Sequence, residues 1–294
     1  MKSVKSKPYK RNCELLEGHE LPVGISRWAL AVEYNGAAFH GFQAQRSGVE
    51  TVQLALENAL SAVADEPITL VCAGRTDAGV HATNQIIHFD TNAVRKDRAF
   101  VFGTNTHLSP GVVVRWARQV SGQFHARFSA VARTYRYIIC NSFVRPALMY
   151  DQLTWQRRPL DVNRMREGAR YLVGEQNFTS FRATQCQAKS PVRTIHHLHL
   201  VRRGELIIME VKANAFLHHM VRNIAGVLME IGIGDREPEW VGEVLAAKNR
   251  CAGGVTAPPY GLHLVSVDFD DRFDLPTLQP GPHFVHEDIG GFAP

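Results

Sequence analysis

Two short β-branched segments, at residues 67–72 and 84–89, are separated by a loop that contains two glycines. Apolar runs of this kind are typical of buried strands. Gly74 and Gly79 permit positive φ angles or the close approach of another backbone, so they predict a constrained loop at a strand end. Loops in that position often carry functional residues. This loop is therefore the leading candidate for a functional site.

Asp77 is the acid within this loop, and its nearest acidic neighbours in the sequence are Glu66 and Asp90. A lone carboxylate near glycines has two interpretations. It supplies a nucleophile or a base in a ligand site, or it accepts hydrogen bonds from its own backbone in a turn. The spacing alone leaves both interpretations open.

Strand and helix patterns alternate along the chain and predict two α+β halves. Strands are expected at residues 27–34, 67–72, 84–89, 111–120, 131–141, 178–182, 192–201, 205–213 and 261–269, and helices at residues 52–64, 95–102, 162–174, 214–232 and from 238. Thr51 and Asp161 are the expected N-caps of two of these helices. Alternating strands indicate a largely antiparallel sheet with helices on one face and an open face for a ligand.

The length of 294 residues is sufficient for two domains. We expect a basic tail at residues 1–26, an N-terminal half at 27–122, a C-terminal half at 123–272 and a Pro/Gly-rich tail at 273–294. The N-terminal tail has no hydrophobic periodicity, and tails of that kind are typically mobile.

The distribution of charge is more informative than the net charge of +5, which the five basic residues at positions 2–11 match, since that segment contains no acid. Residues 98–150 contain seven arginines and no carboxylate, and residues 176–204 contain five Lys or Arg residues and three histidines without a carboxylate. Long stretches of one sign, interleaved with Phe and Tyr, suit a groove for phosphates and bases. An ordinary basic surface is the alternative.

Several classes of protein are disfavoured by the sequence. No apolar run approaches the roughly 20 residues of a membrane span, and no apolar segment of a secretory signal follows the Lys-rich N-terminus. The five cysteines are scattered and include no C-x-x-C pair. An odd, scattered set is typical of reduced thiols rather than of a disulfide framework. We therefore expect a cytoplasmic protein with no membrane contact.

The loop sequence at residues 73–82, AGRTDAGVHA, resembles the active-site signature of the TruA-type tRNA pseudouridine synthases. Five further segments resemble patterns of the same family in the same order, at residues 33–36, 124–130, 133–137, 178–182 and 214–224. Together the six segments extend the resemblance from about residue 27 to residue 269.

The resemblance implies a fold and an activity. The implied fold is α+β, with two ferredoxin-like (RRM-like) lobes whose antiparallel sheets meet in a central basic active-site cleft, assembled as a homodimer. The implied activity is isomerisation of uridine to pseudouridine in the anticodon stem-loop of tRNA, at positions 38, 39 and 40. The implied partner is therefore tRNA.

The resemblance also implies roles for four residues. Asp77 would be the catalytic carboxylate, which could attack C6 of uracil, attack C1′ or remove a ribose proton. Burial disfavours the ionised form of a carboxylate, and Arg222 would supply the cation that offsets this. Tyr135 would stack on the uracil and move a proton with its hydroxyl, and Arg75 would hold or replace the flipped base. The alternatives are a surface arginine at Arg222 and a core aromatic at Tyr135.

The implied reaction requires no cofactor, because its product is an isomer of its substrate. Metal binding by the histidines is the competing possibility. These histidines are His196, His197, His199, His218 and His219. No Cys or carboxylate lies close to them in sequence to complete four ligands, so we expect no metal site.

Other functions explain less of the sequence. A non-catalytic RNA-binding protein with RRM-like lobes would fit the basic and aromatic segments. It would give no reason for the loop around Asp77, and an RNP1-type strand motif is absent. A metal-dependent phosphoesterase would need a carboxylate cluster that the sequence lacks, and glycoside hydrolysis normally needs two carboxylates.

Overall fold

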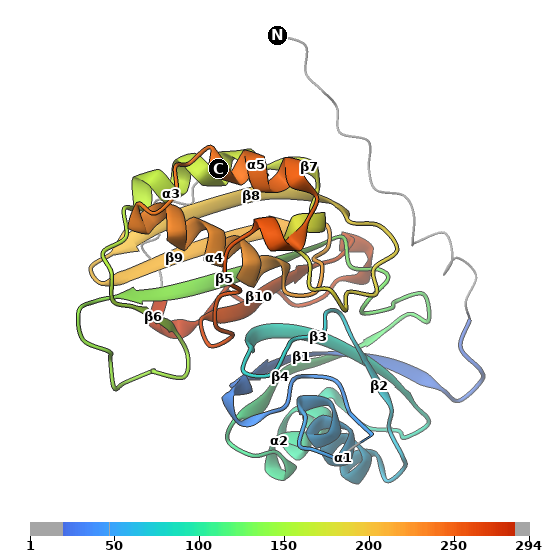
Figure 1. Cartoon of the computed structure of the whole chain (residues 1–294). Coiled ribbons are helices and arrows are strands. Elements are labelled where there is room, and N and C mark those ends of the chain that lie inside the picture. Colours follow the sequence, from blue (N-terminus) through green and yellow to red (C-terminus); the bar gives the residue numbers. More distant parts are fainter. Residues whose placement is uncertain (1–19, 47, 286–294) are drawn as a thin grey trace.

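The structure, a computed structural model, describes residues 20–46 and 48–285, so the outer parts of both expected tails lie outside the described residues. The described residues form ten strands and five α-helices (Figure 1). The strands are β1 (Ser26–Tyr34), β2 (Leu70–Cys72), β3 (His81–Thr91), β4 (Val112–Val120), β5 (Ala132–Asn141), β6 (Thr154–Gln156), β7 (Gly174–Asn177), β8 (Val192–Arg203), β9 (Leu206–Ala213) and β10 (Leu262–Asp268). The helices are α1 (Val52–Ala64), α2 (Thr104–His107), α3 (Val162–Ala169), α4 (Met220–Ile233) and α5 (Trp240–Ala247).

The ten described strands form one continuous sheet. Its order is β4-β1-β3-β10-β5-β9-β8-β7, with β2 beside β3 and β6 beside β5. The last strand, β10, joins the two halves, because it pairs in parallel with β3 and antiparallel with β5. His263 of β10 is opposite His81, and Leu264 is opposite Tyr135.

This arrangement differs from the expectation of two antiparallel sheets that meet. The two parallel pairs are β3–β10 and β5–β6, and the other strand pairs are antiparallel. The physical reason is that β10 pairs along both of its edges. Both sets of backbone hydrogen-bonding groups are thereby satisfied.

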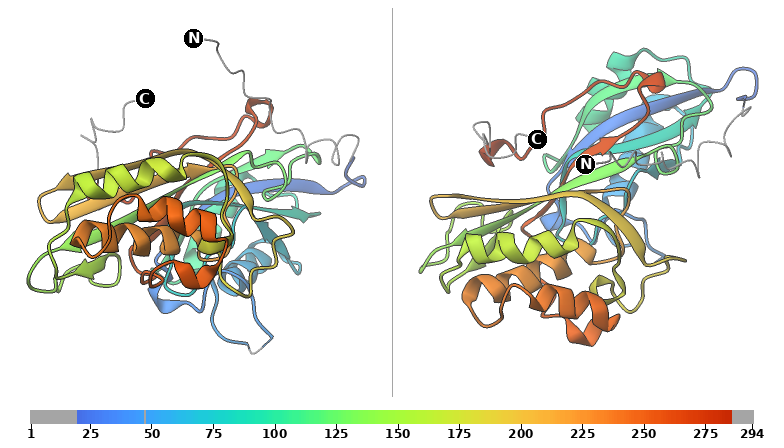
Figure 2. Two further views of the ribbon diagram at one scale, coloured as in Figure 1. Left: turned by 45° about the horizontal axis from the view of Figure 1, so that its top comes forward. Right: turned by 90° about the horizontal axis from the view of Figure 1, so that it is seen from above.

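The helices cover the sheet in two groups (Figures 1 and 2). Helices α1 and α2 lie beside β1, β3 and β4, whereas α3, α4 and α5 lie beside β5, β8 and β9. The fold is therefore a mixed α+β fold. The longest described helix, α4, has 14 residues, and no described helix has the length and apolar character needed to cross a bilayer.

Side-chain caps place α1 and α3 where the sequence predicts them to start. Thr51 Oγ1 accepts a hydrogen bond from Leu54 N at 3.3 Å, and Asp161 Oδ1 accepts one from Asn163 N at 2.8 Å. Each cap satisfies an amide that has no partner within its helix. The capping predictions are therefore confirmed.

The expected strand at residues 178–182 is wrong. This segment contains a 3-10 helix at Thr179–Phe181. At the start of this helix, Thr179 N donates a hydrogen bond to Asn177 Oδ1 at 3.0 Å. Phe178 and Phe181 are both fully buried. A spacing of three residues places them on one side of a helical turn, whereas a strand would place them on opposite faces.

Two helices have different bounds from those predicted. The helix expected at residues 95–102 is displaced toward the C-terminus, where a π-helical turn at Ala99–Gly103 leads into α2. The helix expected to continue to residue 174 ends at Ala169 and is followed by a 3-10 turn at Arg170–Leu172.

Helix α4 begins at Met220 rather than at Asn214. The side chain of Asn214 accepts hydrogen bonds from Thr194 N at 3.1 Å and from Ala215 N at 2.8 Å, so it holds the chain against β8. His219 has a φ of +62°. A residue in the left-handed region interrupts a right-handed helix. Residues 214–219 are consequently a loop that precedes the helix.

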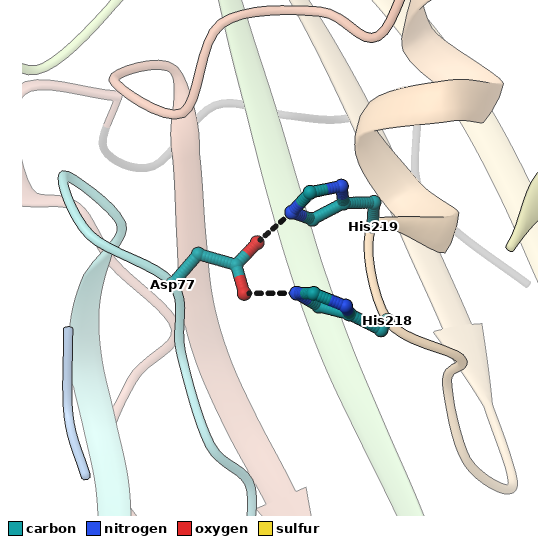
Figure 3. Close-up of side chains that lie close together, drawn as sticks. All are labelled: Asp77, His218 and His219. Atoms are coloured by element: carbon teal, nitrogen blue, oxygen red, sulfur yellow. Dashed lines mark ion pairs between the residues drawn. The ribbon is translucent and has the colours of Figure 1, made fainter. Parts of the chain in front are cut away.

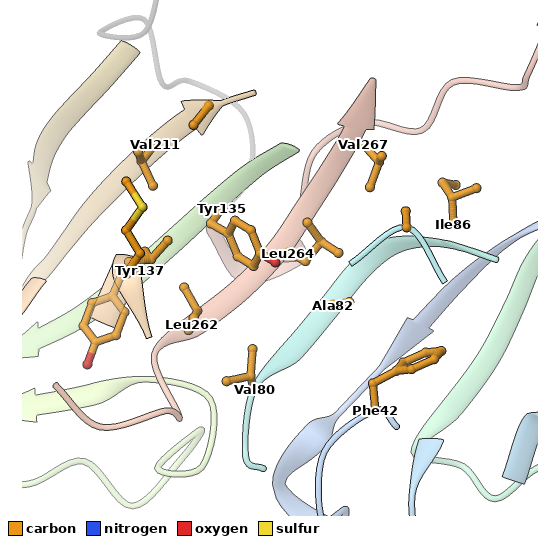
Figure 4. Close-up of a cluster of buried hydrophobic side chains, with 14 of the residues drawn as sticks. Phe42, Val80, Ala82, Ile86, Tyr135, Tyr137, Val211, Leu262, Leu264 and Val267 are labelled. Carbon is orange, nitrogen blue, oxygen red and sulfur yellow. The ribbon is translucent and has the colours of Figure 1, made fainter. Parts of the chain in front are cut away.

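One hydrophobic core continues across the junction of the two halves. Figure 4 shows Val80 and Ala82 near the start of β3, Leu262 and Leu264 on β10, and Tyr135 on β5. All five side chains are buried and belong to one cluster. The two halves are therefore packed together through β10, not only hydrogen-bonded.

The described part of the C-terminal segment is held against β5. Arg136 Nη1 donates hydrogen bonds to Pro280 O at 3.1 Å and to Gly281 O at 2.7 Å. Val285 packs in a second apolar cluster that includes Ile138. Residues 275–282, up to the 3-10 turn at His283–Val285, contain no helix or strand, as the Pro/Gly-rich composition predicts.

Candidate active site

The loop between β2 and β3 is held from several directions. Gly74 N donates to the side-chain oxygen of Gln85 at 3.2 Å. Phe42 N donates to Thr76 O at 3.0 Å, and the Thr76 hydroxyl lies 2.8 Å from the hydroxyl of Tyr34. These contacts anchor both sides of the turn that carries Asp77. The loop is therefore constrained, as its glycines predict.

The carboxylate of Asp77 meets three cationic or imidazole groups from one segment of the C-terminal half. Arg222 Nη1 lies 3.2 Å from Oδ2, His218 Nε2 lies 3.2 Å from Oδ1, and His219 Nε2 lies 3.3 Å from Oδ2. Figure 3 shows both imidazoles directed at the carboxylate. The Asp77 side chain is 27% exposed, so the cluster remains open to solvent.

Arg222 is held in place by a second contact. Its Nε donates to Ala257 O at 2.8 Å, and its side chain is only 14% exposed. The predicted proximity of Arg222 and Asp77 is therefore present, and the alternative of a surface arginine does not hold. Ala257 N donates in turn to Arg222 O at 3.2 Å, so two hydrogen bonds join Arg222 of α4 to the loop that contains Ala257.

The two histidines were not expected to contact Asp77. Burial lowers the pKa of His219, and the nearby Asp77 carboxylate opposes this effect. The side-chain exposed fractions are 40% for His218 and 28% for His219. They precede Arg222 by four and three residues, but they lie in the loop before α4, where helical spacing does not apply. The sequence signal that could have identified them is their position beside Arg222 within the family-like segment at residues 214–224.

Tyr135 lies in β5 and is 8% exposed. Its ring meets Phe216 edge-on at a centroid distance of 5.0 Å. A Cβ built on Gly74 would lie 3.7 Å from the Tyr135 hydroxyl, so this hydroxyl lies beneath the Asp77 loop. Burial raises the pKa of Tyr135, and the adjacent Arg133 opposes the increase. The hydroxyl is therefore protonated at neutral pH.

Arg75 has a different environment. Its side chain is exposed, and within the described part of the chain it makes no hydrogen bond or ion pair. It is close enough to Cys72 to act on that thiol electrostatically, although burial dominates and raises the pKa of Cys72 to about 11. Arg75 thus leaves its guanidinium available at the edge of the site.

Arg133 is a structural residue of the site that sequence reasoning did not assign. Its guanidinium donates to Ala73 O at 2.9 Å, at the start of the Asp77 loop, and to Asn214 O at 3.2 Å, at the start of the loop that carries the histidines. It also donates to Arg127 O at 2.9 Å. One half-buried side chain therefore joins the two loops that form the site.

An aromatic and basic surface lies near this junction. Phe128 is 46% exposed and stacks on His125 at a centroid distance of 4.3 Å. The Arg127 guanidinium lies 5.7 Å from the centre of the Phe128 ring. Exposed rings next to arginines are suited to stacking on nucleic-acid bases.

Only one group of side chains in the described residues has the composition and proximity to hold a metal ion. One ligand atom each from Asp77, His218 and His219 can be chosen so that all three lie within 4.8 Å of one another. His197 of β8 is engaged elsewhere, because its Nε2 lies 3.0 Å from the carboxylate of Glu210. The charge of Glu210 is also shared with Arg136, at 2.8 Å.

Comparison with known proteins covers both segments that form this site. The family described as tRNA pseudouridine synthase matches residues 30–129 and 169–270, which include both Asp77 and Arg222. The chain belongs to the tRNA pseudouridine synthase family. Members of such a family are isomerases, since pseudouridine is an isomer of uridine. Tyr135 lies between the two matched stretches.

Individual relatives in this family match most of the chain. The tRNA pseudouridine synthase A of Pseudomonas aeruginosa is 57% identical over 262 residues, covering 89% of this chain and 92% of the relative. The tRNA pseudouridine synthase A of Nitrosococcus oceani is 57% identical, and the match covers 86% of this chain and 97% of that relative. The tRNA pseudouridine synthase A of Photorhabdus laumondii is 51% identical, and the match covers 89% of this chain and 98% of that relative.

Proposed function

We propose that this chain converts uridine to pseudouridine in the anticodon stem-loop of tRNA, at positions 38, 39 and 40, with Asp77 as the catalytic carboxylate. The observation that carries this proposal is the pairing of Asp77 with Arg222 at 3.2 Å. Each residue lies in one of the two stretches that match the family.

The chemistry needs one carboxylate and a means of moving protons. The C1′–N1 bond of uridine breaks, the base rotates, and C1′ bonds to C5. C5 loses a proton and N1 gains one, so atoms and electrons balance without a redox cofactor. Asp77 acts by attacking C6, by attacking C1′ or by removing a proton from the ribose, and each of these needs the ionised form.

The surroundings of Asp77 place a positive charge beside it. The Arg222 guanidinium lies 3.2 Å from the carboxylate, and its contact with Ala257 O fixes it in position. Tyr135 presents its ring and protonated hydroxyl beneath the same loop, where it would contact the uracil. The exposed Arg75 would bind the tRNA around the extruded base. Extrusion from a stem costs a few kcal/mol, which stacking and phosphate contacts offset.

The remaining features of the proposal concern the assembly. We infer that residues 27–122 and 123–272 act as two ferredoxin-like lobes that enclose a basic cleft for tRNA, and that the enzyme is a cytoplasmic homodimer. The basic and aromatic group of Arg127 and Phe128 supports RNA binding beside the site.

The proposal is tested by incubating the chain with unmodified tRNA in a chelated buffer and mapping pseudouridine by position. Product at positions 38–40 is expected. A non-catalytic RNA-binding protein would retain the tRNA without product. Product only outside the anticodon stem-loop would contradict the proposed specificity while leaving the isomerase activity intact.

A further inference from the structure

The cluster around Asp77 contains a set of ligands that the isomerisation does not require. Two imidazole nitrogens face the carboxylate at 3.2 and 3.3 Å. These separations, which end on different oxygens, are close to the edge of a tetrahedron around Zn²⁺, about 3.3–3.4 Å when the ligands lie about 2.0–2.1 Å from the metal. One ligand atom from each of the three residues can be chosen so that all lie within 4.8 Å of one another. A carboxylate ligates through one oxygen or both, so either mode keeps both imidazoles within reach.

The backbone presents the two histidines in a fixed arrangement. Ala183 N donates to His218 O at 2.9 Å, and Asn223 N donates to His219 O at 2.9 Å. The two rings lie with their centres 4.0 Å apart. Anchored ligands lose little freedom when a metal binds, which favours affinity. The partial exposure of all three side chains gives an ion access to them.

Arg222 is the main obstacle to a cation here, because its guanidinium lies 3.2 Å from Oδ2. The guanidinium makes no hydrogen bond with Oδ1, which faces His218. The hydrogen bond from Arg222 Nε to Ala257 O holds the guanidinium beside Oδ2. An arginine on the second oxygen of a metal-bound carboxylate acts as an outer-shell hydrogen-bond donor. The guanidinium therefore lowers the affinity without removing the site.

We propose that Asp77, His218 and His219 form an inhibitory site for Zn²⁺. Two histidines and one carboxylate are a ligand set that zinc accepts in sites that keep one position for water, and imidazole also suits Co²⁺. A metal on the Asp77 carboxylate occupies the group that must act on the uridine. Zinc and the substrate uridine are therefore mutually exclusive. This inhibitory consequence rests on the proposed function, whereas the metal site itself does not.

Binding is tested without RNA. The full chain is titrated with Co²⁺ and followed by its visible absorption, and Zn²⁺ is then added as a competitor. One Co²⁺ per chain with a tetrahedral spectrum, displaced by Zn²⁺, is expected. His218→Ala and His219→Ala should each weaken Zn²⁺ binding at least tenfold, since even outer-shell changes cost about 10–100-fold. His107→Ala, which changes an exposed histidine on α2, should not change the affinity.

Inhibition is tested with tRNA. Zn²⁺ should reduce pseudouridine formation, and EDTA should restore it; EDTA alone should not lower the rate. The histidine variants alter the site and can change the rate without Zn²⁺. Inhibition of each variant is therefore expressed as the ratio of its rate with Zn²⁺ to its own rate without Zn²⁺. The half-inhibitory concentration should rise by the same factor as the dissociation constant. Saturating tRNA should weaken Zn²⁺ binding reciprocally.

Three results would overturn the site. The first is no spectral change in the wild-type chain, and the second is an affinity that neither His218→Ala nor His219→Ala alters. The third is an affinity lost in His197→Ala, which would move the metal to β8. Bound zinc without inhibition would overturn the inhibitory role alone. A chain that makes no pseudouridine in EDTA would refute the proposed function, while the Co²⁺ titration would still decide the site.

Discussion

Arg222 Nη1 lies 3.2 Å from Asp77 Oδ2, although 145 positions separate the two residues in the chain. Asp77 lies in the loop before β3, and Arg222 lies in the first turn of α4. The second contact of Arg222, with Ala257 O, fixes the direction of the guanidinium. The packing of two distant segments therefore places the positive charge of Arg222 beside the carboxylate. Substitutions at Asp77 and at Arg222 are expected to change the rate of isomerisation by different amounts.

Asp77→Asn should abolish isomerisation and leave tRNA affinity nearly unchanged, because phosphate contacts dominate RNA binding. Single-turnover rates and filter binding measure the two effects. Asp65→Asn is the control, because this exposed residue has a left-handed conformation that Asn accepts. A rate within tenfold of wild type, a barrier change of about 1.4 kcal/mol, would exclude Asp77 from the chemistry. Mass spectrometry must exclude deamidation back to Asp.

Arg222→Ala should lower the single-turnover rate by about 10- to 100-fold, since a hydrogen bond to a charged group contributes about 1.5–3 kcal/mol. Arg222→Lys should lose less, because it keeps the charge but not the second donor to Ala257. Arg158→Ala is the matched control, because Arg158 forms an exposed pair with Asp235. Equal rates for the Ala and Lys variants would show that charge beside Asp77 is unimportant.

Tyr135→Phe separates the hydroxyl of Tyr135 from its ring. Proton transfer by a side chain contributes about 10²–10⁴-fold, so this variant should bind tRNA normally and lose most of its rate. Tyr135→Leu should in addition lose affinity, since stacking on a base contributes about 1–3 kcal/mol. A wild-type single-turnover rate for the Phe variant would assign the proton transfer to another group. Identical behaviour of both variants would rule out stacking.

Gly226→Ala should destabilise the fold. A Cβ at Gly226 would overlap the carbonyl oxygen of Val255, where the loop that contacts Arg222 crosses α4. Overpacking of this kind costs about 1–3 kcal/mol, which urea unfolding measures. Gly242→Ala in α5 is the control, because its Cβ would lie 3.4 Å from Tyr171. Equal stability of the two variants would contradict the close approach.

The stability should decrease when the pH falls below about 6.5, partly because of His88. Burial lowers the pKa of His88 from 6.5 to about 3. Between about pH 6.5 and pH 3, His88 binds a proton in the unfolded chain but not in the folded chain. Its contribution to the free energy of unfolding is therefore fully present above pH 6.5 and is lost as the pH falls toward 3. At pH 5 the loss is about 2 kcal/mol for one such group.

Urea unfolding at pH 7 and pH 5 measures this loss. His88→Gln should reduce the difference between the two pH values, because Gln does not titrate and can still accept from Ala126 N, as His88 Nδ1 does at 3.1 Å. His107→Gln, at an exposed position, should leave the difference unchanged. A difference that His88→Gln does not alter would assign the acid sensitivity to other groups.

Local sequence patterns determined much of the secondary structure. The caps at Thr51 and Asp161 could be predicted because the groups that form them are close in sequence. The loop at Asp77 could be predicted because its two glycines lie within the segment itself. The resemblance to the family also placed Asp77 and Arg222 in one site, as the structure does. The roles of all four residues stay predictions. The structure places Tyr135 in a buried position and leaves Arg75 exposed without a partner in the described residues.

Tertiary structure decided the features that depend on distant partners. The single sheet arises because β10 pairs with β3 on one edge and with β5 on the other. Helix α4 starts late because Asn214 bonds to β8, and this leaves His218 and His219 in a loop that faces Asp77. Backbone edges and side-chain amides can bond to many partners. Only the packed chain selects among them, so no local pattern could specify these contacts.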